Sequence, residues 1–191
     1  MKITFPSTPI QTNRLSLRPF MACDFDQYAA YHSQPSVYRY LYAAPPAANV
    51  LTEQFSVVLT APFDAEGDVF RLAVINRDDD TLLGEVLLKL ASIAALQAEV
   101  GYIFNPDFSG HGYATEAVSA MIDLGFNHFG FHRIFARLDT ENIGSVGIVE
   151  RLGLRCEAHL IENDRFNGVW GDEYIYAVLA AEWQSRSRNR A

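Results

Sequence analysis

The chain has 191 residues, of which 49 % are apolar, and a formal net charge of −8. This length and composition predict one globular domain over residues 1–191 and exclude a disordered chain. No apolar run reaches the roughly 18 residues that a membrane span requires, and the negative charge disfavours nonspecific nucleic-acid binding. Two cysteines are too few for a disulfide framework, so we expect reduced thiols and a cytoplasmic protein.

Hydrophobic periodicity predicts the elements in chain order. Strands are expected at residues 14–18, 68–75, 82–90, 99–104, 132–139, 154–162 and 173–179. Helices are expected at residues 25–32, 49–60, 114–129 and 142–151. A loop rich in tyrosine and proline is expected at 36–46, and a flexible tail at 186–191. A meander followed by helix, strand, helix and strand pair predicts a mixed α+β sheet with helices on both faces.

The most informative segment of the chain is a glycine-bearing loop between a strand and a helix. The strand at 99–104 stops at Asn105-Pro106, and the loop that follows contains Gly110 and Gly112 and runs directly into the next helix. Free backbone N–H groups at a helix N-terminus bind anions, so the loop predicts a phosphate or pyrophosphate site. It is neither a P-loop nor the dinucleotide fingerprint, because no Gly-Lys follows and Thr115 occupies the third glycine position.

Residues 99–117, EVGYIFNPDFSGHGYATEA, resemble the acetyl-coenzyme A loop of the GNAT superfamily of N-acetyltransferases. More narrowly, they are similar to the RimJ/RimL branch, which acetylates protein N-termini, including those of ribosomal proteins. Further segments with this likeness are residues 13–19, 84–86, 142–145, 150–154 and 170–183. The resemblance implies a mostly antiparallel, twisted sheet of about seven strands, acetyl-CoA as co-substrate and no metal.

The resemblance also implies how the cofactor is held. Backbone amides of residues 110–115 would bind the pyrophosphate, and the strand at 99–104 would splay from its neighbour to admit the pantetheine arm. The implied cofactor-binding residues are Tyr102, Ile103, Phe104, Gly110, His111, Gly112, Tyr113, Ala114, Thr115 and Asn142. Ser109 departs from the Gln, Arg or Trp that relatives often carry, so we expect main-chain contacts to dominate. For His111, a phosphate contact and an exposed loop position are equal alternatives.

Glu99 is the leading candidate for the general base. Several family members place a catalytic glutamate there, and strand alternation puts Glu99 on the same face as Gly101. A structural carboxylate paired with an arginine is the equal alternative. Glu85, Glu162, Asp164 and water are the competing bases.

Ser145 is the candidate for assisting the leaving thiolate. Many superfamily members use a tyrosine as general acid in this helix, but Val149 occupies that position here, and Ser145 is the substitute typical of the RimJ/RimL branch. A thiol pKa of about 8.5 means that the departing thiolate needs little more than a hydrogen bond. Asn142 would orient the pantetheine or Ser145, and it is also a candidate N-cap for its helix.

These features together predict an N-acetyltransferase that works by direct attack of an amine in a ternary complex. The expected acceptor is a protein N-terminal amine; a polyamine, amino sugar or amino acid is the alternative. A non-catalytic coenzyme A-binding sensor or partner module is a further alternative. The net negative charge is compatible with a cationic amine, and the tyrosines between residues 38 and 42 either line an acceptor cleft or pack on the surface. The oligomeric state stays open, a homodimer being one option.

Overall fold

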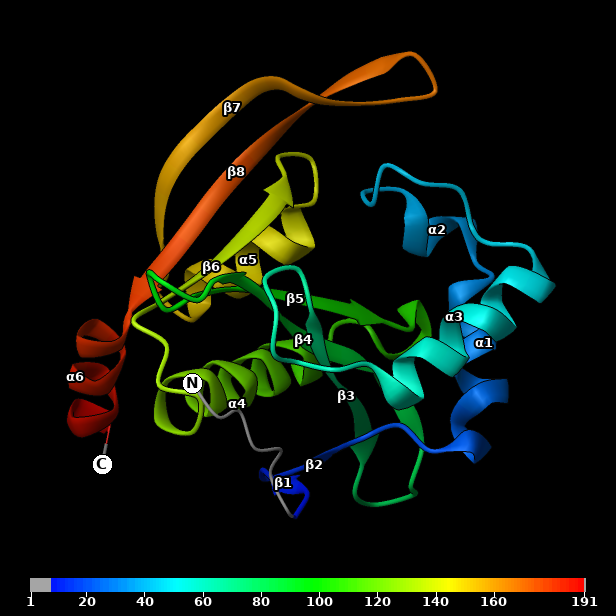
Figure 1. Cartoon of the computed structure of the whole chain (residues 1–191), viewed down its shortest axis with the longest axis horizontal. Coiled ribbons are helices and arrows are strands. Elements are labelled where there is room, and N and C mark those ends of the chain that lie inside the picture. Colours follow the sequence, from blue (N-terminus) through cyan, green and yellow to red (C-terminus); the bar gives the residue numbers. More distant parts are fainter. Residues whose placement is uncertain (1–7, 191) are drawn as a thin grey trace.

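The computed structural model describes residues 8–190, with side chains as far as residue 186. Within this range one eight-stranded sheet is surrounded by six α-helices (Figure 1). The strands are β1 Ile10–Gln11, β2 Leu15–Arg18, β3 Val69–Asn76, β4 Leu82–Ser92, β5 Gln97–Phe104, β6 Arg133–Asp139, β7 Arg155–Phe166 and β8 Val169–Leu179. The helices are α1 Phe25–His32, α2 Pro35–Tyr38, α3 Ala48–Thr60, α4 Tyr113–Asn127, α5 Ile143–Arg151 and α6 Ala180–Arg190.

The sheet has the strand order β1-β2-β3-β4-β5-β6-β8-β7. Every neighbouring pair is antiparallel except β5 and β6, which run parallel and are joined through α4. The predicted α+β class and mostly antiparallel sheet are therefore confirmed. The sheet has one strand more than expected, because the two-residue β1 pairs with β2 at the edge.

Helices cover both faces of the sheet, as predicted. The larger core lies against α4 and α5, where Val118, Met121 and Ile122 are fully buried at helical spacing. The smaller core lies under α1 and α3 on the opposite face and includes Tyr31 and Phe55. The sheet therefore separates two distinct environments, and each strand presents alternate residues to one or the other.

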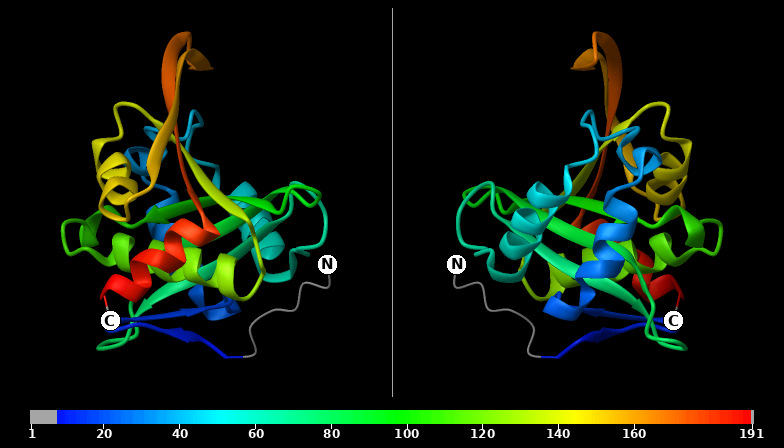
Figure 2. Two further views of the ribbon diagram at one scale, coloured as in Figure 1. Left: turned by 90° about the vertical axis from the view of Figure 1, so that its left-hand side faces the viewer. Right: turned by 90° about the vertical axis from the view of Figure 1, so that its right-hand side faces the viewer.

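Three segments differ from the sequence-based expectation. The expected loop at 36–46 begins with the short helix α2, and residues 186–190 of the expected tail continue helix α6, while Ala191 lies outside the described residues. The final strand pair is longer than predicted and projects from the body as a two-stranded arm (Figures 1 and 2). The outer part of this arm lacks the alternating burial that identifies a strand from sequence, since most of its residues are exposed.

Among residues 8–190, no helix combines the length and the apolar character needed to cross a bilayer.

Candidate active site

The sheet opens between its two parallel strands. β5 and β6 pair only through Gln97, Ala98 and Glu99, although both strands continue for several residues. The predicted splay of the strand at 99–104 from its neighbour is therefore confirmed. The amide of Asn105 donates to the carbonyl of Leu83 at 2.9 Å, which fixes the side of β5 that faces β4.

Strand alternation then decides which backbone groups of β5 face the opening. Ile103, two residues before Asn105, also points its backbone groups toward β4, where its carbonyl lies against Gly84. The N–H and C=O groups of Tyr102 and Phe104 consequently face β6, beyond the last paired residue. They have no backbone partner there within the described chain, so they are available to an extended ligand.

The loop before α4 presents an unusual row of unpaired amides. Ser109 donates its N–H to Pro106, and Glu116 donates to Gly112, but the amides at positions 110–115 have no acceptor within the described residues. Gly112 adopts φ +79° and precedes the first residue of α4, so the helix starts without a side-chain cap. Six free N–H groups at the positive end of a helix dipole are suited to hold an anion. Residues 109–114 are called the anion loop below.

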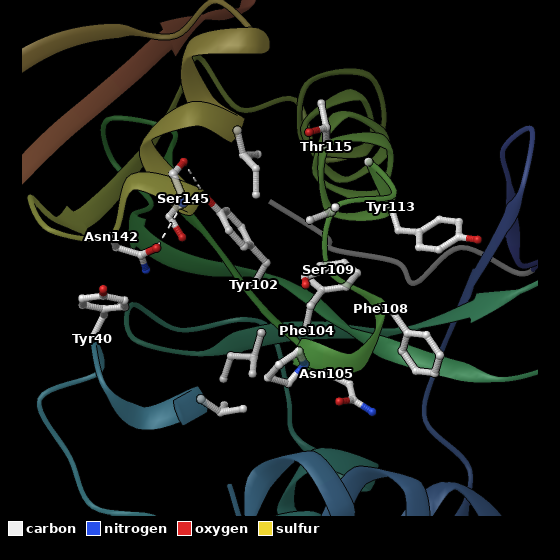
Figure 3. Close-up of a pocket in the computed structure, with 18 of the residues that line it drawn as sticks. Tyr40, Tyr102, Phe104, Asn105, Phe108, Ser109, Tyr113, Thr115, Asn142 and Ser145 are labelled. Carbon is white, nitrogen blue, oxygen red and sulfur yellow. Dashed lines mark hydrogen bonds between the residues drawn. The ribbon is translucent and has the colours of Figure 1, made fainter. Parts of the chain in front are cut away.

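A cavity of about 810 Å³ joins this loop to the opening between the strands (Figure 3). All of the residues predicted for the site line it except Glu99 and His111. The His111 ring instead folds back on its own loop, with Nδ1 2.9 Å from the Ser109 carbonyl. It is stacked with the Tyr113 ring, and the two ring centroids are 5.7 Å apart. Arg151 is the only formally charged side chain among the described residues of the lining.

The start of α5 forms one wall of the cavity. The Asn142 side chain accepts a hydrogen bond from the Ser145 N–H at 3.1 Å and therefore caps the helix. Figure 3 shows Tyr102 reaching from β5 toward this turn, and its hydroxyl donates to the Ser145 carbonyl at 3.1 Å. Burial raises the pKa of Tyr102 to about 12, so this phenol remains a donor at neutral pH.

Glu99 lies on the sheet face opposite the larger core. Its carboxylate accepts from Nε of Arg137 at 3.1 Å, and its side chain is 19 % exposed. Cross-strand register places Asp139 of β6 opposite Glu173 of β8 on this same face. The structure thus pairs Glu99 with an arginine, as the alternative interpretation expects. Burial would lower the pKa of Arg137, but the charges of Glu99, Glu173 and Asp164 all raise it.

The other carboxylates named from the sequence come from two different strands, β4 and β7. Glu85 is fully buried in β4, where it pairs with Arg71 and accepts from the Tyr31 hydroxyl at 3.3 Å. Glu162 and Asp164 lie on the exposed outer part of β7. None of the three lines the cavity.

Sequence reasoning missed several residues of the cavity wall. Ile148 and Arg151 follow Ser145 at intervals of three residues, so helical periodicity places all three on the face of α5 that meets the cavity. Leu41, in the segment after α2, was also missed, whereas Tyr40 is one of the tyrosines expected to line either a cleft or the surface, and it lines the cavity. Figure 3 shows Tyr40 beside Asn142 at the end of the cavity away from Tyr113.

No group of three or more His, Cys, Asp or Glu side chains within the described part of the chain is arranged to hold a metal ion.

An open sheet with one short parallel pair, beside a helix N-terminus rich in free amides, is the architecture of a GNAT acetyltransferase. Residues 14–155 match the family model described as an acetyltransferase (GNAT) domain. The chain belongs to this family and is an acetyl-CoA-dependent acyltransferase.

Similar proteins support this assignment along the whole fold. The uncharacterized N-acetyltransferase YnaD of Bacillus subtilis is 31 % identical over 174 residues, which cover 91 % of this chain and 98 % of that protein. The GNAT-family acetyltransferase of Bacillus anthracis superposes with a TM-score of 0.80 at 27 % identity, covering 92 % of this chain and 100 % of the other. A spermidine N(1)-acetyltransferase of Vibrio cholerae is 27 % identical over 117 residues, or 61 % of this chain and 68 % of that protein.

Proposed function

We propose that the protein transfers an acetyl group from acetyl-CoA to a primary amine by direct attack within a ternary complex. The observation that supports this most strongly is the junction of two features. Unpaired backbone groups of β5 face the gap beside β6, and five of the six residues with unpaired amides, Gly110 and residues 112–115, line the same cavity. The first feature suits an extended amide-containing arm and the second suits a diphosphate.

The chain's own groups can then be assigned to steps. The N–H of Tyr102 or Phe104 would donate to the thioester oxygen as negative charge develops there. Ser145, at the start of α5, would donate a hydrogen bond to the departing sulfur. Glu99 would accept the amine proton through water. Each of these three roles is proposed from the position of the group relative to the cavity.

The acceptor that we propose first is a protein N-terminal amine, as in the RimJ/RimL branch. No carboxylate lines the cavity within the described residues, so strong base assistance near the acetyl group is lacking. An α-amino group with a pKa of about 7.8 costs about 1 kcal/mol to deprotonate at pH 7, against about 4.6 kcal/mol for a lysine amine. The weakly basic surroundings therefore favour an α-amine.

A polyamine or other small cationic amine is the second candidate, and a second hollow supports it. This hollow, of about 350 Å³, adjoins the main cavity through Tyr40 and is lined by aromatic and acidic residues, including Tyr42, Trp170, Asp139 and Asp172. Aromatic faces and carboxylates both attract ammonium groups. The similarity to a spermidine N(1)-acetyltransferase agrees with this candidate.

The test is a product screen with the purified protein. Acetyl-CoA is supplied with peptides of free N-terminus, polyamines, amino sugars and amino acids, while thiol release and acetylated mass are followed. Acetylated peptide supports the first candidate, and acetylated polyamine alone supports the second. Tight coenzyme A binding without thiol release from any amine would indicate a non-catalytic module and overturn the proposal.

Glu99→Gln is expected to lower kcat/KM by about tenfold near pH 6 and by less near pH 9, because only a protonated amine needs a base. The pH profile of the purified variant is the measurement. Asp78→Asn, in the exposed turn between β3 and β4, is the control and should leave the profile unchanged. A Glu99→Gln profile that coincides with wild type at every pH would assign proton removal to water or to another group.

Tyr42, in the segment after α2, contacts β6 and β8 beside the second hollow. The Tyr42 hydroxyl donates to the Asp139 carboxylate at 2.7 Å. The Tyr42 ring also packs against Gly171, and a Cβ atom at position 171 would lie 2.7 Å from two carbons of the ring. Burial and the hydrogen bond to Asp139 raise the pKa of Tyr42, so the contact persists through neutral pH. Tyr42 thereby helps to position Tyr40 at the cavity.

Gly171→Ala is therefore expected to displace Tyr42 and raise KM for the acceptor by about fivefold, a loss of roughly one hydrogen bond. KM for acetyl-CoA should stay unchanged, since the anion loop is distant in the fold. Steady-state kinetics with each substrate varied in turn measures both values. Gly168→Ala alters the same arm without touching Tyr42 and should leave the acceptor KM unchanged; equal effects from both variants would refute the role of Tyr42.

We also propose a cytoplasmic location, which the two unpaired and exposed cysteines support.

A further inference from the structure

Arg14, the residue before β2, contacts the anion loop from outside the cavity. Its Nη1 donates to the carbonyl of His111 at 2.9 Å, across 97 residues of sequence. Its Nε donates to Glu116 at 2.8 Å, and its Nη2 lies 2.7 Å from the same carboxylate. The guanidinium also lies over the Tyr113 ring, 4.6 Å from its centroid. One side chain therefore holds the loop and the start of α4 at three points.

Glu116 anchors Arg14 from the first turn of α4. Its carboxylate also accepts from the Thr12 hydroxyl at 2.6 Å and from the Arg14 N–H at 3.0 Å. Burial alone would raise the pKa of Glu116, but the hydrogen bonds from Thr12 and Arg14 outweigh it and lower that pKa. The carboxylate is therefore ionised at neutral pH, which fixes the guanidinium in one place.

The bond to the His111 carbonyl sets the direction of the next amide. In a trans peptide the C=O of one residue and the N–H of the next point in opposite directions. Arg14 does not line the cavity, whereas Gly112 does. Because the carbonyl of His111 is drawn toward Arg14, the N–H of Gly112 points to the opposite side, where the cavity lies.

We propose that Arg14 is a positioning residue for cofactor binding: it locks the peptide between His111 and Gly112 so that the Gly112 amide faces the phosphates of the acetyl donor. This inference rests on the proposed function, which assigns the loop to those phosphates. It also accounts for a loop whose Ser109 cannot supply a cationic side chain of its own. The arginine that contacts the loop comes from a segment 97 residues earlier in the chain.

The test compares Arg14→Met with Arg77→Met. Arg77 donates from Nη1 to the Thr12 carbonyl at 2.6 Å, so it braces the same β1–β2 turn without touching the loop. Calorimetry measures the Kd of coenzyme A, and kinetics compares acetyl-CoA with acetyl-pantetheine, which has no phosphate. Arg14→Met should weaken coenzyme A binding about tenfold, the effect of one misdirected amide. The Arg14→Met variant should keep the wild-type kcat and the wild-type KM for acetyl-pantetheine. The Arg77→Met variant should match wild type in the Kd of coenzyme A and in its kinetics with both donors.

Arg14→Lys tests orientation against charge. One ammonium group keeps the positive charge but cannot hold Glu116 and the His111 carbonyl together, so most of the weakening should remain. Full recovery by lysine, or equal losses with acetyl-CoA and acetyl-pantetheine, would overturn the inference. If Arg14→Met does not fold, Arg14→Lys is compared with wild type and with Arg77→Met in its place.

The two levels of failure are distinct. A wild-type protein that binds no coenzyme A would remove the proposed function itself. A wild-type protein that binds it, with an Arg14→Met variant that binds equally well, would remove only the role of Arg14.

Discussion

Gly112→Val is expected to raise the Kd for coenzyme A by about a hundredfold, the largest effect of any single substitution in the site. Gly112 holds φ +79° immediately before α4, a conformation that a β-branched residue adopts only at considerable cost. Valine must either accept that strain or rotate the preceding peptide. Rotation would turn the amide that Arg14 directs toward the cavity, so binding suffers in both cases.

Calorimetry with coenzyme A measures this effect, and Gly67→Val is the matched control. Gly67 also has a positive φ, +96°, and a Cβ at this position would have no atom within 4 Å; the residue lies in the turn before β3. Its substitution should therefore cost stability through the same backbone strain but leave the Kd unchanged. Equal Kd values for wild type and Gly112→Val would show that the 110–115 amides do not bind the phosphates.

Arg71→Met is expected to lower the free energy of unfolding by about 3 kcal/mol, because it leaves a buried carboxylate without its cation. Glu85 is 0 % exposed and pairs with Arg71, while His32 and Tyr31 lie on its other side. Chemical denaturation near pH 7 measures the loss. Arg133→Met breaks the more exposed pair with Glu157 and should cost only about 0.5 kcal/mol.

The pH dependence of this loss has a definite sign. Burial would raise the pKa of Glu85, but the Arg71 charge and the neighbouring His32 outweigh it and lower that pKa in the native protein. A lowered native pKa contributes stability above the unfolded value of about 4.3 and loses it as the pH falls through the native value. Without Arg71 the carboxyl group should be protonated more readily.

The difference in stability between wild type and Arg71→Met should therefore narrow as the pH falls from about 7 to about 4. Glu85→Gln, which removes the charge but keeps the shape, should show a weaker dependence on pH than wild type. A difference between wild type and Arg71→Met that stays constant over this range would contradict the assignment of the loss to the unpaired carboxylate.

Local patterns in the sequence predict most of the fold and the anion loop. The bounds of α1 are those expected, and each predicted strand and helix is present with ends that shift by a few residues. These elements have strong periodicity, because one face of each is buried against a core. The loop at 109–114 is recognisable for a similar reason: its glycines and the helix after it are adjacent in sequence.

Features that depend on distant contacts could not be predicted in this way. Asp139 and Glu173 meet only because β6 pairs with β8, and Arg14 reaches the His111 carbonyl across the edge of the molecule. The outer part of the β7–β8 arm carries no burial signal, since it packs against little of the body. Sequence periodicity reports which face is buried but not which partner buries it.

The short pairing of β5 with β6 divides the molecule into a five-stranded sub-sheet, β1–β5, and a three-stranded one, β6–β8. Only three residue pairs form the seam between them in the described chain, supplemented by helix packing on one side. A donor molecule that contacts β5, the α4 terminus and the α5 terminus touches elements on both sides of this seam. We therefore expect a bound donor to stiffen the protein, and we expect local opening to be easiest along this seam, beside the cleft where we propose that the transfer takes place.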